Sequence, residues 1–202
     1  MTQRSASHRA RRFLKEERAS ITVEFLIFLP VMIWVLLIGY VYFDVYRAEY
    51  YLNRASLTIA DMFSRERAAI DADYLDGTEG ILNEMINTDA SPDYRVTVIG
   101  YTEPGDSYFH VWSENRGWDG NHTLASVTAL ADDLPIMGDD DRIILLEFRT
   151  TYVPPFRMTL WPFRNTTLGE IDLASTTLIA PRYVSRLCYD TEPSNPLNGL
   201  LC

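Results

Sequence analysis

The sequence is poor in the residue types that most enzymes and metalloproteins use in their active sites. Its 202 residues include three histidines (His8, His110 and His122), two cysteines and one lysine. It has no CxxC pair, no HExxH, GxSxG or SxxK motif and no phosphate-binding Walker loop. Each of these motifs sets a nucleophile, a base or a metal ligand at the spacing that its chemistry requires. We therefore expect a non-enzymatic protein with no cofactor and no catalytic residues.

Positive charge is also scarce outside the N-terminus. The whole chain has a net charge of −10, whereas its first 19 residues hold six basic and two acidic side chains, a net charge of +4. With Glu24 counted separately, residues 25–202 therefore carry −13. Because binding to nucleic acid requires clustered cations, this acidic region is not expected to bind DNA or RNA.

The longest uncharged feature of the chain is the apolar run from Phe25 to Phe43. A helix rises about 1.5 Å per residue, so this run covers most of the ~30 Å hydrocarbon core of a bilayer. A helix also satisfies its own backbone polar groups, which lipid cannot do. The run predicts a transmembrane helix over residues 20–45. Basic residues next to a span stay in the cytoplasm, so the N-terminus is expected inside and the C-terminal region outside.

A cleaved secretory signal is the alternative interpretation of this run. Such signals usually have an apolar core of ~7–15 residues, followed by a cleavage site made of small residues. Here the run is longer, and residues 44–52 contain no pair of small residues separated by one position. The sequence therefore favours a retained membrane anchor.

The two cysteines, Cys188 and Cys202, both follow the span. Outside the cytoplasm, two such thiols normally pair. Closing a loop of this length stabilises a fold by roughly 3 kcal/mol in the chain-entropy account. The alternative is a buried Cys188 with a free Cys202. We expect the disulfide.

Helical periodicity continues beyond the span. Apolar residues recur at three- and four-residue steps, and no glycine or proline interrupts residues 40–70. The membrane helix is therefore predicted to continue to about residue 67 as an amphipathic helix whose apolar stripe must be covered. The stripe consists of Val45, Ala48, Leu52, Ala55, Ile59, Met62 and Phe63.

The remaining sequence predicts a small sheet that covers this stripe. Residues 94–101 alternate as a half-buried strand does, and a Pro-Gly turn separates them from a second strand, so the two form a hairpin. Together these patterns predict an α+β fold: a long transmembrane-then-amphipathic helix packed on a small antiparallel sheet of about four strands. The predicted strands are 94–101, 107–113, 142–153 and 169–179; the shorter helices are 74–86 and 124–134; and residues 181–202 form a loop closed by the cysteines.

Three consecutive acidic residues, Asp139, Asp140 and Asp141, leave two interpretations open. They contribute to a calcium site, or they form an acidic turn exposed to water. No spaced Asp-x-Asp-x-Asp-Gly loop surrounds them, which favours the turn.

The junction before the span has a distinctive order of residues. A basic tail is followed by a small residue, four further residues, a glutamate, a phenylalanine and an apolar helix with an early proline. This order resembles type IV pilins and pseudopilins, most closely the TadE-like minor pseudopilins of the tight-adherence (Tad/Flp) pilus system. The similarity covers residues 16–45; residues 52–65 and 138–155 also look like later parts of that family. The matching positions are Glu17, Arg18, Ser20, Val23, Glu24, Phe25 and Pro30.

The resemblance implies a cytoplasmic leader, residues 1–19, that a prepilin peptidase removes between Ala19 and Ser20. Ala19 stands where the family usually has glycine, so a processed and an unprocessed N-terminus both remain open. Glu24 would pair with the α-ammonium of a neighbouring subunit during assembly, and Pro30 would bend the helix. Solvation by lipid headgroups is the alternative explanation of a carboxylate at Glu24.

The resemblance also implies a location and partners. The helix would lie in a bacterial inner membrane, with residues 46–202 as a pilin-like domain in the periplasm. Its partners would be the prepilin peptidase, other Tad pilins and pseudopilins, and the inner-membrane assembly platform of pili used in adhesion, biofilm formation and secretion. The resemblance does not separate TadE from TadF, or a fibre subunit from an assembly factor. The alternatives are a membrane-anchored periplasmic sensor or binding module, and a tethered hydrolase for which no motif nominates a nucleophile.

Overall fold

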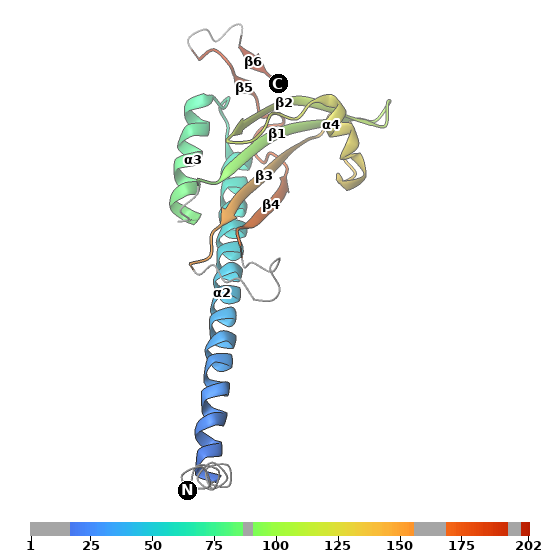
Figure 1. The fold of residues 1–202 in the computed structure, drawn as a ribbon. Helices are drawn as coiled ribbons and strands as arrows, with labels where there is room; N and C mark the ends of the chain where they lie inside the picture. Colours follow the sequence, from blue (N-terminus) through green and yellow to red (C-terminus); the bar gives the residue numbers. More distant parts are fainter. Residues whose placement is uncertain (1–16, 87–90, 156–168, 194–198) are drawn as a thin grey trace, which may run out of the picture. The chain divides into compact units, whose positions relative to one another are not determined.

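The computed structural model describes residues 17–86, 91–155, 169–193 and 199–202 (Figure 1). The chain divides into two compact units, Met1–Asp44 and Val45–Cys202. One helix, α2 (Glu17–Arg65), contributes its apolar N-terminal part to the first unit and its amphipathic part to the second. The predicted continuation of the helix beyond the span is confirmed, and the helix ends two residues before the predicted boundary.

The second unit contains the predicted antiparallel sheet. Its four strands lie in the order β2-β1-β3-β4, and each strand is antiparallel to its neighbour. The α+β fold class predicted from the sequence is thus present. The strands are β1 (Asp93–Thr102), β2 (Ser107–Arg116), β3 (Arg142–Tyr152) and β4 (Ile171–Ile179).

One face of the sheet packs on the apolar stripe of α2. Leu52, Ala55, Ile59 and Phe63 are completely buried there, in a core that also contains the inward side chains of β1 and β3. Burying an isoleucine or leucine side chain contributes about 1.5–3 kcal/mol, so this stripe is a principal source of the domain's stability. Helix α3 (Ala72–Ile86) adds to the same core, and the carboxylate of Asp71 accepts the Tyr74 amide 2.8 Å away at its start.

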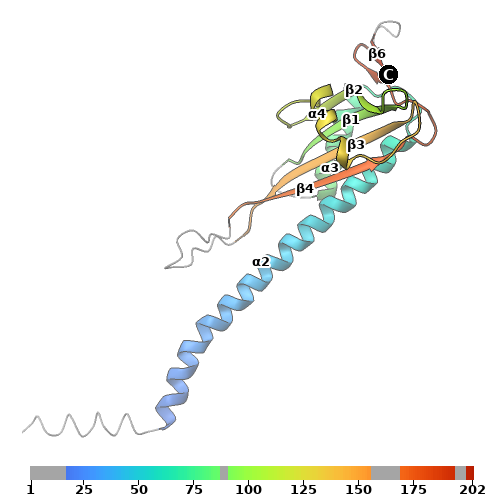
Figure 2. The same cartoon turned by 90° about the vertical axis from the view of Figure 1, so that its right-hand side faces the viewer.

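The other face of the sheet is also covered, which the sequence pattern did not indicate. Val96, Thr97, Val98, Ile99 and Gly100 are all buried, so the prediction of a half-buried first strand was wrong. Figure 2 shows α4 (Leu124–Ala129) on the side of the sheet opposite to α2. A second, smaller core forms beneath it. Its fully packed members are Ile99, Val127, Ile143 and Leu145, joined by Tyr108, Leu130, Leu134 and Met137.

The helix predicted over residues 124–134 is divided in two. Helix α4 ends at Ala129, because Leu130, with a φ of −92° and a ψ of 0°, leaves the helical region, and the short 3-10 helix η1 (Ala131–Asp133) follows. The C-terminal tail also carries more structure than the predicted loop. A two-stranded ladder joins β5 (Tyr189–Asp190) to β6 (Leu200–Leu201), and Ile70 forms a parallel bridge with Tyr189.

Candidate functional site

The N-terminal unit presents an apolar helix that the described residues leave bare. Among the residues of α2 from Ile21 to Tyr40, all except Trp34 and Leu37 are exposed, and Leu26 has 72% of its surface exposed. It is the one described helix long and apolar enough to cross a membrane, and none of its most apolar window is buried. A core helix of a soluble protein would bury an apolar stripe against its own chain. This segment therefore meets the requirements of a single membrane span near the N-terminus.

The residues implicated by the family resemblance lie in this part of α2. Ala19 and Ser20 fall within the helix, which begins at Glu17. Glu24 is exposed and lies four residues after Ser20, about 6 Å further along the axis and on the same face of a helix. Pro30 lies inside the helix, where its missing N–H removes one backbone hydrogen bond.

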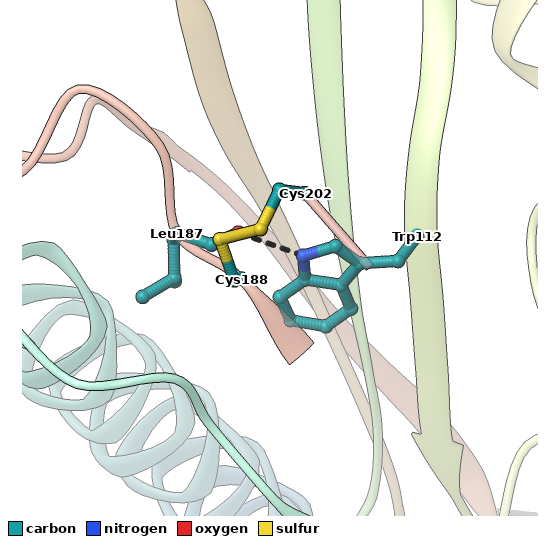
Figure 3. The surroundings of a disulfide bond; sticks show 4 residues. All are labelled: Trp112, Leu187, Cys188 and Cys202. Carbon is teal, nitrogen blue, oxygen red and sulfur yellow. Dashed lines mark hydrogen bonds between the residues drawn. A yellow bond between two sulfur atoms is a disulfide. The ribbon is translucent and has the colours of Figure 1, made fainter. Parts of the chain in front are cut away.

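The cysteines occupy the end of the second unit. Cys188 and Cys202 form a disulfide with an S–S distance of 2.07 Å, the pair expected from the sequence. The indole of Trp112 lies beside this bond (Figure 3), and its Nε1 donates to the carbonyl of Leu187 at 2.8 Å. The ring of Tyr189 stacks on Trp112 with 5.4 Å between centroids. The disulfide closes the tail on itself, and a buried hydrogen bond and an aromatic stack fasten the tail to β2.

A buried polar cluster on the α4 side of the sheet was not predicted. Arg95 and Glu147 are directly opposite each other on β1 and β3, and their side chains form a bidentate pair with N–O distances of 2.8 and 3.0 Å. His122 approaches the same carboxylate, with 2.9 Å between Nε2 and Glu147 Oε2. Its side chain is only 8% exposed. No local spacing could have indicated this cluster, because it depends on the register of β1 against β3.

The cluster holds the loop between β2 and α4 against the sheet. The carbonyl of Gly120 accepts from Arg95 Nη1 at 3.1 Å, and the His122 amide donates to Ser113 at 3.0 Å. The Trp118 ring receives the guanidinium of Arg95 at 4.7 Å and that of Arg149 at 4.8 Å. Two hydrogen bonds and two cation–π contacts therefore hold the loop against the sheet, rather than a single contact.

Ser126, His122 and Glu147 are the residue types of a hydrolytic triad, but their connections are structural. The Glu147 carboxylate contacts Nε2 of His122, and Ser126 Oγ is 2.8 Å from Nδ1 of the same ring. Ser126 Oγ also accepts the Thr123 amide and donates to the Thr123 carbonyl, both at 2.9 Å. These bonds form the capping box that begins α4. The Ser126 hydroxyl is thus used in capping α4. The contacts of Glu147 with Arg95 and His122, which we name the clamp, hold the loop in place, and the arrangement does not favour Ser126 as a nucleophile.

His110 lies in β2 near this cluster. Burial lowers the pKa of its imidazole, and the neighbouring His122 lowers it further. Its Nε2 is buried and has no hydrogen-bond partner among the residues that the structure describes. The site therefore favours the neutral ring, because a buried charge without a partner is costly.

The acidic triplet is stabilised by arginines. Asp140 contacts Arg142 at 2.9 Å and Arg186 at 2.7 Å, and the Arg186 guanidinium holds the pKa of the Asp140 carboxyl below its usual value. The Asp139 carboxylate accepts the Glu103 amide at 2.9 Å. Within the described ranges, no group of three or more acidic, histidine or cysteine residues is arranged to hold a metal ion. These contacts account for the triplet as part of a turn.

Comparison of the chain with protein-family models, curated proteins and solved structures found no match.

Proposed function

We propose that this protein is a TadE-like minor pseudopilin that supports assembly of Tad/Flp pili without enzymatic activity. One observation carries the proposal. A single carboxylate, Glu24, stands at the N-terminal border of an apolar helix that the described residues leave bare. The junction before it resembles a prepilin peptidase site, with Ala19 where the family usually has glycine.

In this proposal the leader remains in the cytoplasm, and α2 spans the inner membrane of a bacterium. The prepilin peptidase cleaves between Ala19 and Ser20, which creates a new α-ammonium at Ser20. A carboxylate near the membrane border is costly to leave without a partner as helices gather and water is displaced. The α-ammonium of a neighbouring subunit is a partner of opposite charge, so Glu24 would be neutralised as subunits assemble.

Residues 46–202 would then form the periplasmic head. The two cores, the disulfide and the clamp around Glu147 make this head a rigid unit suited to contact with other subunits. The partners in this proposal are other Tad pilins and pseudopilins and the inner-membrane assembly platform. Such a role needs recognition surfaces and a membrane anchor, and it needs no catalytic cleft.

N-terminal sequencing of the full-length protein tests the proposal. We expect the mature chain to begin at Ser20 in cells that contain the cognate prepilin peptidase, and at Met1 in cells that lack it. A mature chain that begins after Phe43 would instead identify a cleaved secretory signal. An N-terminus at Met1 in both strains would favour an ordinary anchor that carries a sensor or binding module.

A further inference from the structure

The amphipathic part of α2 has a second apolar stripe, on the face turned away from the sheet. It consists of Tyr46, Tyr50, Asn53 and Leu57, which we name the outer seam. The three apolar members are 61%, 59% and 62% exposed, respectively. The sheet lies along the other side of this part of α2 (Figure 2), where Leu52, Ala55 and Ile59 are buried.

The spacing of the outer seam is that of a helix–helix contact. Its members follow steps of four, three and four residues, which is the a/d repeat of parallel coiled coils. Counting the same repeat backwards along the sequence reaches Phe43 and then Gly39. A side chain at Gly39 would meet nothing within 4 Å, and small residues at such positions permit close approach of helices in membranes.

Lipid does not account for the outer seam beyond Tyr46. Asp44 is the first charged residue after the span, and Leu57 lies 13 residues beyond it, about 20 Å along the helix. The headgroup region of one leaflet is only about 5–7 Å thick. A tilt of about 20°, typical of membrane helices, shortens the 20 Å by less than a tenth. Leu57 would therefore stand well above the headgroups, and Tyr50, about 9 Å beyond Asp44, just above them, where a protein surface is needed to cover them.

The charges beside the outer seam indicate which protein surface fits. Glu49 lies on one side of the stripe and Arg54 on the other, and both are exposed. In two parallel helices, the residue before an a position, here Tyr50, faces the residue five places later on the partner helix. Glu49 of each copy would therefore face Arg54 of the other copy. An antiparallel pair would instead bring like charges together, but copies inserted in one orientation are necessarily parallel.

We infer that the outer seam is the contact surface for a second copy of this chain, in a parallel dimer. The inference rests on the membrane anchorage of the proposed function and does not require pilus assembly. A seam of this length would not hold two helices together in water by itself. Anchoring both helices in one membrane raises their effective concentration and compensates for the short contact. The next positions of the repeat, Ala60 and Ser64, are buried by the chain's own domain, so the contact ends at Leu57.

Cysteine crosslinking of the full-length protein in membranes tests the inference. Asn53 lies in the seam, whereas Thr58 is also exposed but lies outside it. Under mild oxidation, Asn53→Cys should form a species of twice the chain mass, and Thr58→Cys should not. Labelling with a maleimide under reducing conditions checks that both thiols are accessible, and the unsubstituted protein shows the background from Cys188 and Cys202.

Charge reversal in the Asn53→Cys background tests the geometry. Glu49→Arg or Arg54→Glu alone should lower the dimer association constant by about tenfold, because each reverses two attractive pairs. The double reversal should restore it. The inference would be overturned if positions 53 and 58 crosslink equally, or if position 53 does not crosslink. It would also be overturned if the double reversal does not restore dimer association, or if the crosslinked product contains a different protein. Pilus assembly and the N-terminus at Ser20 are measured separately, so failure of one proposal does not imply failure of the other.

Discussion

The Nε2 atom of His122 lies 2.9 Å from the Glu147 carboxylate, although 25 residues separate the two along the chain. Glu147 is held at the same time by both arms of the Arg95 guanidinium. The carboxylate therefore joins two neighbouring strands to the loop that precedes α4. Removal of either partner leaves a nearly buried charge that water cannot fully solvate.

We predict that Glu147→Gln lowers the free energy of unfolding by about 3 kcal/mol, because it leaves the Arg95 guanidinium without its counter-charge. Urea unfolding of the protein in detergent measures the change. Asp132→Asn is the matched control, since Asp132 is an exposed acid in η1, and its substitution should change stability by less than about 0.5 kcal/mol. Equal effects of the two substitutions would contradict the role assigned to the clamp.

Stability should also depend on the protonation of His110. Its pKa in the folded protein is lowered by burial and by His122, so the unfolded chain binds a proton more readily than the folded one below the usual pKa of 6.5. The stability contributed by the neutral ring is therefore present at higher pH, and it is lost as the pH falls from 6.5 through the folded-state pKa.

His110→Phe should remove this part of the pH dependence. Between pH 7.5 and pH 5, we expect the melting temperature of the wild type to fall further than that of the variant. The two curves should run parallel above pH 7.5, where His110 is neutral in both states. Parallel curves over the entire range would show that His110 makes no such contribution.

The disulfide should contribute strongly to the stability of the head. Replacing both Cys188 and Cys202 by serine is expected to lower the free energy of unfolding by about 3 kcal/mol, because the open tail gains conformational entropy when it unfolds. Thermal unfolding with and without a reductant measures this. Reductant should lower the melting temperature of the wild type and leave that of the double variant unchanged. A reductant effect in the double variant would show that its action does not depend on this bond.

The second core, beneath α4, should contribute to the free energy of unfolding, as the first core does. Ile99 is completely buried beneath α4, whereas Ile136 is 99% exposed. Ile99→Ala should destabilise the protein by about 3 kcal/mol, through lost burial and the cavity left behind. Ile136→Ala makes the same chemical change and should have little effect. Urea unfolding compares the two, and similar values would mean that α4 does not cover the sheet in solution.

Glu24 is the residue on which the proposed role depends. Glu24→Ala should still insert into the membrane, because removal of a charge makes the helix more apolar. It should fail to support piliation, since the α-ammonium of a neighbouring subunit would lose its counter-charge. Membrane fractionation and electron microscopy of surface fibres measure the two outcomes. Glu24→Asp keeps the charge and serves as the control. Normal piliation by Glu24→Ala would contradict the proposed pairing.

Local patterns were sufficient wherever neighbours along the chain decide the structure. The strand over residues 142–153 and the stripe from Val45 to Phe63 were predicted nearly to the residue, because side-chain periodicity reports which face is buried. The same reasoning was wrong about the burial of β1. A prediction from alternation assumes that one face of the strand is exposed to water, and the sequence carries no direct sign that α4 lies over Ile99.

The amino-acid sequence by itself determined the elements: a helix long and apolar enough to cross a membrane, its amphipathic continuation, four strands and a pair of cysteines. Each of these depends on residues close together in the chain or on a property that a single segment carries. The tertiary structure alone decided the strand order, the second core and the meeting of His122 with Glu147. These depend on the register of β1 against β3 and on how the chain returns across the sheet. Contacts between distant residues follow from the packing of the whole domain, and no local pattern encodes them.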